Sequence, residues 1–187
     1  MKHLGTSLLA IVSLSTLLIL TQRPAHADRD DGPAAIERQR IELGFSITPV
    51  HLEFRREDRQ LVGLGSYLVN AVGGCNDCHT NPSYVVGGNP FKGQPKQVNV
   101  AHFLGGGQAF GPFISRNLTP ENGRPAGRSF SEFKNILRTG IDYDNAHPPQ
   151  GHLLQVMPWP TYQSMSDHDI LAMYMYLKAI PPATPGI

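Results

Sequence analysis

Hydrophobic positions recur at helical spacing in three segments of the chain. The first lies between Asp58 and Asn70, where leucines stand three and four positions apart, a pattern that predicts an amphipathic helix. Gly63 and Gly65 fall within it and lower its helix propensity by about 1 kcal/mol each relative to alanine. A helix tolerates glycine where another backbone must come close, so the two glycines predict a point at which a second helix crosses.

Two further helices are predicted in the C-terminal third. Ser129, followed three residues later by Glu132, forms a capping box at the start of an apolar stripe, and Gly140 is placed to end that helix. Ser166 gives a weaker start signal of the same kind for the last helix, which a proline pair at 181–182 stops.

The remaining segments lack this periodicity. Residues 75–111 contain several glycine pairs and prolines and no convincing alternating strand, and so long a structureless stretch usually has a functional cause. Residues 41–54 carry scattered apolar side chains around Pro49. This pattern predicts an extended segment on the surface, which would be a strap over the core or an arm that docks on a partner. The periodicity thus predicts three helices, separated by long loops rich in glycine and proline.

The N-terminus has the features of an export signal. A short basic start precedes a charge-free, mostly apolar run at residues 4–20, and a small-x-small site follows at residues 25–27. We expect residues 1–27 to be a signal peptide that is cleaved after Ala27, which would make the protein periplasmic. The alternative is an uncleaved membrane anchor, because the apolar run is nearly long enough to span a bilayer.

Composition narrows the class of protein further. The 187 residues suit one domain, which we expect at 58–187 after an extension at 28–57. The 16 Lys and Arg nearly balance the 15 Asp and Glu, so the charge gives no case for nucleic acid or anionic lipid as a partner. Glycine and proline together make up about a fifth of the chain, a high share for a domain whose helices alone must supply the core.

One short motif carries the chemistry. Cys75, Cys78 and His79 form C-x-x-C-H, the attachment signature of haem c. The two thiols can form thioethers to the vinyl groups of one haem, and the imidazole then becomes the proximal ligand of the iron. The alternatives are a disulfide, a thioredoxin-like redox pair and a zinc site. The redox pair would need a βαβ setting, zinc usually needs four ligands, and the sequence shows neither.

The sixth position on the iron needs a ligand or an opening for substrate. Met157 is the preferred candidate, because prolines and a tryptophan around it would stiffen its loop, and a His/Met pair raises the reduction potential. Three other methionines are better core fillers: Met165, Met173 and Met175. Four histidines are alternative ligands: His102, His147, His152 and His168. Of these, His168 suits a solvated position in the first turn of a helix, and His147 and His152 suit the surface of a loop.

These motifs together resemble class I c-type cytochromes, and they are especially similar to the monohaem bacterial domains found in cytochrome subunits of dehydrogenases. The resemblance covers residues 58–182 and rests on residues 65–68 (GSYL), 75–79 (CNDCH), 117–120 (NLTP), 157–159 (MPW), 166–167 (SD), 174–177 and 181–182 (PP). The extension before Asp58 and the long, glycine-rich interval between His79 and Met157 depart from a minimal cytochrome.

The resemblance implies an all-α, class I cytochrome c fold, with few helices around one covalently bound haem and with long Gly/Pro-rich loops. The first and last helices would cross near the haem, and His79 and Met157 would be its axial ligands. The stretch around Asn117 would line the haem near its propionates. The glycine-rich loops at 87–120 would then wrap the cofactor, because close backbone approach favours glycine.

The function expected on this basis is electron transfer, either as a soluble shuttle or as a non-catalytic subunit associated with a dehydrogenase, with a redox protein as partner. One alternative is a haem c enzyme or gas-binding sensor with a displaceable sixth ligand, in which His102 or His152 would serve as a distal base. Another is a binding module whose two cysteines form a disulfide.

Overall fold

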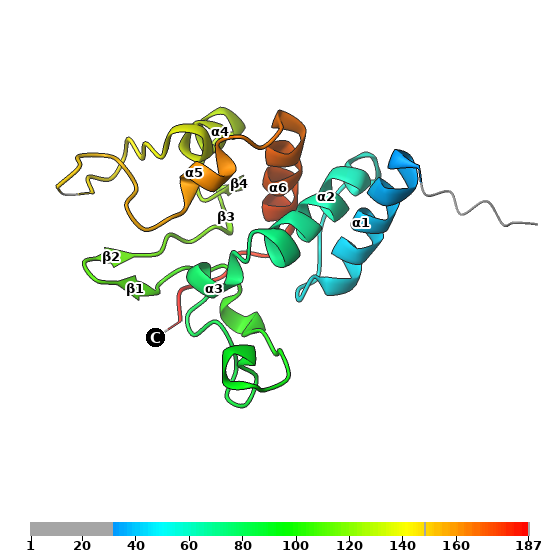
Figure 1. The fold of residues 1–187 in the computed structure, drawn as a ribbon, viewed down its shortest axis with the longest axis horizontal. Coiled ribbons are helices and arrows are strands. Elements are labelled where there is room, and N and C mark those ends of the chain that lie inside the picture. Colours follow the sequence, from blue (N-terminus) through cyan, green and yellow to red (C-terminus); the bar gives the residue numbers. More distant parts are fainter. Residues whose placement is uncertain (1–31, 148, 187) are drawn as a thin grey trace, which may run out of the picture. The chain divides into compact units, whose positions relative to one another are not determined.

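The computed structural model of the chain describes residues 32–147 and 149–186, which are mostly helical (Figure 1). The α-helices are α1 (Pro33–Ile47), α2 (Arg59–Tyr67), α3 (Asn76–His79), α4 (Phe130–Thr139), α5 (Trp159–Tyr162) and α6 (Asp167–Ala179). The expected signal peptide at residues 1–27 lies outside the described residues. None of the described helices is long and apolar enough to cross a membrane.

Shorter elements join the helices. Three are 3-10 turns, η1 (Arg56–Asp58), η3 (Pro90–Lys92) and η4 (Val100–His102), and η2 (Leu68–Val72) is a π-helical turn. Two small antiparallel hairpins pair β1 (Ala109–Phe110) with β2 (Phe113–Ile114), and β3 (Pro120–Glu121) with β4 (Arg124–Pro125). Apart from three isolated β-bridges, these two-residue strands are the only departure from the expected all-α fold among the described residues, and they lie within the loops.

Helix α2 is crossed twice, once at each of its glycines. A Cβ atom at Gly65 would overlap the carbonyl oxygen of Ala172 on α6, and one at Gly63 would lie 2.6 Å from side-chain atoms of Ile41 and Phe45 on α1. The expected crossing between the helix predicted at 58–70 and the last helix is therefore confirmed at Gly65. Gly63 marks a separate crossing with α1.

Helix α1 corrects the expectation for the segment before α2. The sequence pattern predicts an extended segment from residue 41 onward, but residues 41–47 are the last turns of a 15-residue helix, and only residues 48–55 are extended. The helix packs through Gly44, whose backbone lies against Gly63, and the Ser66 hydroxyl donates to the Gly44 carbonyl over 2.7 Å. Contact through a glycine backbone leaves no apolar stripe in the sequence, which is why periodicity misses this helix.

The extended residues that follow α1 lie against the core. Val50, Leu52 and Phe54 pack on buried side chains, and the amide of Glu53 donates to the Ala179 carbonyl over 2.8 Å. These contacts are those expected of a strap.

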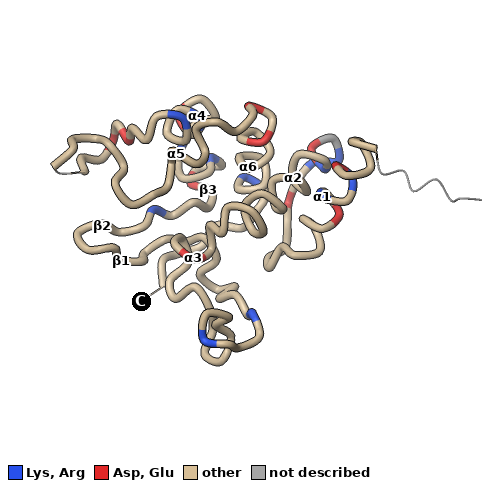
Figure 2. The backbone as a smooth tube through the Cα atoms, viewed as in Figure 1, with Lys and Arg blue, Asp and Glu red and all other residues tan. Residues whose placement is uncertain are grey.

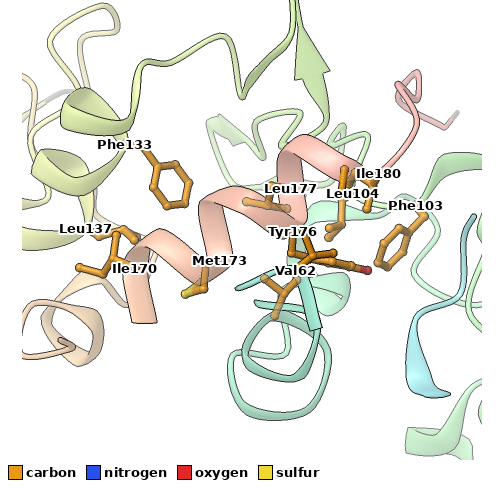
Figure 3. Close-up of a cluster of buried hydrophobic side chains, with 12 residues drawn as sticks. Val62, Phe103, Leu104, Phe133, Leu137, Ile170, Met173, Tyr176, Leu177 and Ile180 are labelled. Atoms are coloured by element: carbon orange, nitrogen blue, oxygen red, sulfur yellow. The ribbon is translucent and has the colours of Figure 1, made fainter. Parts of the chain in front are cut away.

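The hydrophobic core gathers around α6, whose residues face both α2 and α4 (Figure 3). Ile170, Tyr176 and Leu177 of α6 are almost fully buried. The Tyr176 hydroxyl lies 3.0 Å from the Thr48 hydroxyl and accepts from Asn70 Nδ2 over 3.0 Å. A buried phenol needs such partners, and here they tie α6 to the end of α1 and to η2.

The predicted ends of α4 and α6 are confirmed. Ser129 caps α4 in a full capping box with Glu132, and Gly140 ends that helix with a φ of 70°. Ser166 caps α6 by accepting from the Asp169 amide over 3.0 Å. Both α4 and α6 then line the site described next.

Candidate functional site

The C-x-x-C-H motif forms one short helical turn. Gly74, with a φ of 57°, turns the chain out of η2, and Cys75 then starts α3. Cys75 and Cys78 stand three residues apart, a spacing that brings side chains to one face of a helical turn. The described thiols are free rather than joined in a disulfide. Burial raises the pKa of Cys75 to about 12, helped by the nearby Cys78.

All four residues predicted for the site line one cavity. Its volume is about 530 Å³, within the range of small-molecule and cofactor sites. Cys75, Cys78 and His79 contribute from one part of the wall, and Met157 contributes from a loop 78 positions later in the chain. Most of the remaining wall is apolar and includes Phe113, Phe133, Ile136, Leu137, Met173 and Leu177.

The ring of His79 is held in one orientation. Its Nδ1 lies 2.7 Å from the carbonyl oxygen of Arg116, and because a carbonyl can only accept, Nδ1 carries the proton. The lone pair of Nε2 is therefore left for a ligand, as is usual for metal-binding histidines with a backbone partner. Burial lowers the pKa of His79 below its ordinary value, although the Arg116 carbonyl acts in the opposite direction.

Met157 lies on a loop that is fixed at both sides. The Trp159 amide donates to the Met157 carbonyl over 2.8 Å, and the Leu154 amide donates to the Gly140 carbonyl over 2.8 Å. The indole of Trp159 donates to the Leu154 carbonyl over 3.2 Å and packs so closely on Gly140 that a Cβ there would overlap it. The stiffness expected of this loop thus comes from the tryptophan and from Gly140.

The other methionines and most histidines lie where the sequence suggests. Met173 belongs to the buried core, where it also reaches the cavity wall, and Met165 and Met175 pack against the core. His168 is exposed. His102 and His152 make hydrogen bonds to backbone carbonyls and do not line the cavity.

His147 is the exception, because it lines the cavity rather than lying on the surface as expected. Its ring centroid lies 5.8 Å from that of Phe113, and its Nε2 lies 3.4 Å from a carboxylate oxygen of Asp142.

A charged corner of the cavity is not foreshadowed by any sequence pattern. Arg128 and Asp142 are both buried at the wall, and the Arg128 Nη2 atom lies 2.9 Å from the Asp142 Oδ1 atom. The side chain of Asp144, which is exposed, forms a second ion pair with the same guanidinium. The Nε atom of Arg128 is buried without a hydrogen-bond partner among the described residues. Arg128 directly precedes the Ser129 cap, and its sequence context does not distinguish it from an ordinary surface arginine.

Asn117, in the stretch expected to line the haem, has a structural role. Its Oδ1 accepts from the amide and hydroxyl of Thr119, and its Nδ2 donates to the Ala183 carbonyl over 2.7 Å. The neighbours Arg116 and Leu118 do line the cavity. The stretch therefore reaches the cavity through the residues on either side of Asn117, and its place near the propionates stays a prediction.

The residues present fit a haem. An apolar cavity with two thiols on one wall, an imidazole with a free Nε2 and a thioether sulfur offers the donors that haem c requires. The orphaned Nε of Arg128 offers a donor for an acidic substituent.

Comparison with known proteins identifies the family. The gluconate 2-dehydrogenase cytochrome c subunit of Pantoea cypripedii is 33% identical over 119 residues, which are 62% of this chain and 22% of that protein. The alcohol dehydrogenase (quinone) cytochrome c subunit of Gluconacetobacter polyoxogenes is 30% identical over 130 residues, 67% of this chain and 25% of that protein. The chain contains a class I c-type cytochrome domain. This family implies a haem c cofactor.

The cytochrome domain is also similar to part of a dehydrogenase subunit whose name does not mention a cytochrome. A nicotinate dehydrogenase subunit of Pseudomonas putida is 32% identical over 94 residues, 44% of this chain and 8% of that protein. The chain therefore spans about a quarter or less of the length of these curated relatives. No family model matches the chain, and no solved structure matches it.

Proposed function

We propose that the protein is a periplasmic electron-transfer protein with one haem c, covalently bound through Cys75 and Cys78, with His79 and Met157 as axial ligands. Residues 1–27 would be the signal peptide, residues 28–57 the extension and residues 58–187 the cytochrome domain. The observation that carries the proposal is the common cavity wall shared by these four side chains.

The chain's own residues have distinct tasks in this proposal. When bound, haem c supplies an iron that gains and loses one electron. The Arg116 carbonyl orients His79, the Trp159 and Gly140 contacts hold Met157 in place, and the apolar walls exclude water, which favours the less charged reduced state. Arg128 would face a propionate with its Nε. With both axial positions filled, no position remains for substrate, so the protein would carry electrons and not catalyse.

The partner would be a dehydrogenase, since the relatives are named as cytochrome subunits of such enzymes. The protein would act as a shuttle or as an associated subunit.

The test is expression in a host that attaches haem c, followed by visible spectroscopy. We expect covalent haem in the wild type, a low-spin spectrum in both oxidation states and no rapid binding of carbon monoxide. Met157→Ala should convert the spectrum to high spin, whereas Met175→Ala, a methionine at the core that does not line the cavity, should not. A purified protein without covalent haem, or a low-spin spectrum retained in Met157→Ala, would contradict the proposal.

A haem c enzyme or gas sensor with a displaceable sixth ligand is the second candidate. It is favoured by His147, which shares the cavity with Met157 and could act on a bound ligand. Rapid carbon monoxide binding to the reduced wild-type protein that is slowed in His147→Ala would support this candidate over the carrier.

A further inference from the structure

The loops at residues 83–100, here called the lobe, do not wrap the cavity. Five residues between Gly73 and His79 line the cavity, and the next residue along the chain that does so is Phe110. In the view of Figure 1 the loops between α3 and β1 lie below α3, whereas α4 and α5, which border the cavity, lie above it. The expectation that the glycine-rich stretch encloses the cofactor is therefore wrong for the lobe.

The lobe nevertheless has a defined structure of its own. The Val85 amide donates to the Gln97 carbonyl over 3.1 Å, and the Gln97 amide donates to the Gly88 carbonyl over 2.9 Å. Asn89 caps the turn η3 by accepting from the Phe91 amide over 2.9 Å. A Cβ at Gly88 would lie 2.6 Å from that of Gln97, so the two sides of the lobe are closely packed.

This ordered lobe displays large apolar side chains to solvent. Val86 is fully exposed, Phe91 is 78% exposed and Val100 is 51% exposed. Single exposed apolar residues are common, but several on one structured loop indicate an interaction surface.

The lobe is also one-sided in charge. Lys92 and Lys96 are its only charged residues, and no Asp or Glu occurs between Asp77 and Glu121. Figure 2 shows the same segment with basic positions and no acidic ones. A partner surface that complements the lobe would therefore be acidic around an apolar centre.

The lobe is tied directly to the haem-attachment motif. Asn76 donates to the Ser83 carbonyl over 3.1 Å, the Ser83 hydroxyl donates to the Asp77 carbonyl over 3.1 Å, and the Tyr84 hydroxyl bonds the Asp77 carboxylate. Cys78 of the same helical turn is exposed. A partner seated on the lobe would thus be held next to the helical turn that carries the haem-attachment motif.

We propose that the lobe is the docking surface for a redox protein that presents an acidic patch around an apolar centre. This inference rests on the proposed electron-transfer function. A lipid surface fits less well, because the basic segments that bind anionic membranes carry about four to eight cations, and the lobe has two. A weak, partly electrostatic contact suits a transient electron-transfer complex.

The first experiment identifies the occupant in the native host with the full, haem-loaded chain. A photo-crosslinking amino acid replaces Val86 or Phe91, and replaces Leu43, an exposed residue of α1, as the matched control. We expect both lobe positions, and not the control, to form an adduct with one redox protein, identified by mass spectrometry. An adduct with a second copy of this chain, an adduct with lipid alone, or no adduct at either lobe position would overturn the proposal.

The second experiment measures haem reduction by the protein identified in this way. At low salt we expect Lys92→Glu with Lys96→Glu to slow the second-order rate about tenfold, and the difference to fade at high salt. Val86→Ser with Phe91→Ser should slow the rate at both salt concentrations, whereas the control Lys178→Glu should not. Wild-type rates in both lobe variants would overturn the proposal.

Reduction by ascorbate separates this proposal from the function on which it rests. It should proceed equally in all variants, because ascorbate needs no docking surface. If the wild type cannot be reduced by ascorbate and reoxidised, the electron-transfer function itself fails.

Discussion

Gly65 of α2 and Ala172 of α6 are in direct backbone contact, so close that a Cβ atom on Gly65 would overlap the Ala172 carbonyl oxygen and lie 2.8 Å from the Cβ of Tyr176. The contact lets the buried face of α6 reach both α2 and the cavity, where Met173 and Leu177 form part of the wall. The helix crossing and the candidate cofactor site are therefore parts of one packing arrangement.

Gly65→Ala should strongly destabilise the protein. The added methyl group cannot be accommodated by a side-chain rotation, because the obstacle is backbone, so the two helices must separate. Overpacking of this kind costs about 1–3 kcal/mol, and we expect the upper end. Urea unfolding of the haem-loaded protein measures the loss. Gln60→Ala, at an exposed position of α2, is the control and should change stability by less than about 0.5 kcal/mol.

The sequence predicts those helices whose first residues include a recognisable capping motif. The capping box at Ser129 and the cap at Ser166 place α4 and α6, because a side-chain hydroxyl that satisfies a free amide acts within its own turn. Helix α1 escapes prediction because it packs through the backbone of Gly44. Of the site, the covalent and axial candidates could be predicted from one motif and one stiff loop. The Arg128–Asp142 pair could not, since only the tertiary fold buries it.

The Arg128–Asp142 pair predicts a pH-dependent contribution to stability. Burial alone would raise the pKa of Asp142, but hydrogen bonds to Asn145 and His147 and the charge of Arg128 outweigh it and hold the pKa below its ordinary value. The folded state therefore binds this proton less tightly than the unfolded chain. The stabilisation is present above the unfolded pKa, which is about 3.9, and is lost as the pH falls through the lower folded pKa.

Asp142→Asn should therefore destabilise the protein by about 3 kcal/mol at pH 7, because it removes the buried negative charge that pairs with the Arg128 guanidinium. The cost should be smaller at about pH 3.5, where the stabilisation from the wild-type carboxylate begins to be lost. Urea unfolding at the two pH values checks both expectations. Asp144→Asn, which alters the exposed partner of the same arginine, should cost less than about 1 kcal/mol. A cost for Asp142→Asn that does not change with pH would contradict the assignment.

The cap of α4 should make a measurable contribution. Ser129→Ala removes the acceptor for the Glu132 amide and the hydroxyl that bonds its carboxylate, which we expect to cost about 1 kcal/mol. Ser129→Thr should recover most of that loss, because its hydroxyl can both accept from the Glu132 amide and donate to the Glu132 carboxylate. Thermal unfolding with Ser164→Ala as the exposed control tests this, and equal stability of the alanine variant and the wild type would show that the cap is not needed.

Trp159 should control how firmly Met157 is held. Trp159→Phe keeps an aromatic ring against Gly140 but removes the indole donor to the Leu154 carbonyl, a hydrogen bond worth about 1 kcal/mol. If Met157 is the axial ligand, the looser loop should let an added ligand such as imidazole replace it about fivefold more readily. Titration of the oxidised protein with imidazole, followed in the visible spectrum, measures this affinity. Tyr143→Phe, which alters an exposed ring that does not line the cavity, is the control, and an unchanged affinity in Trp159→Phe would show that the methionine loop does not depend on the indole.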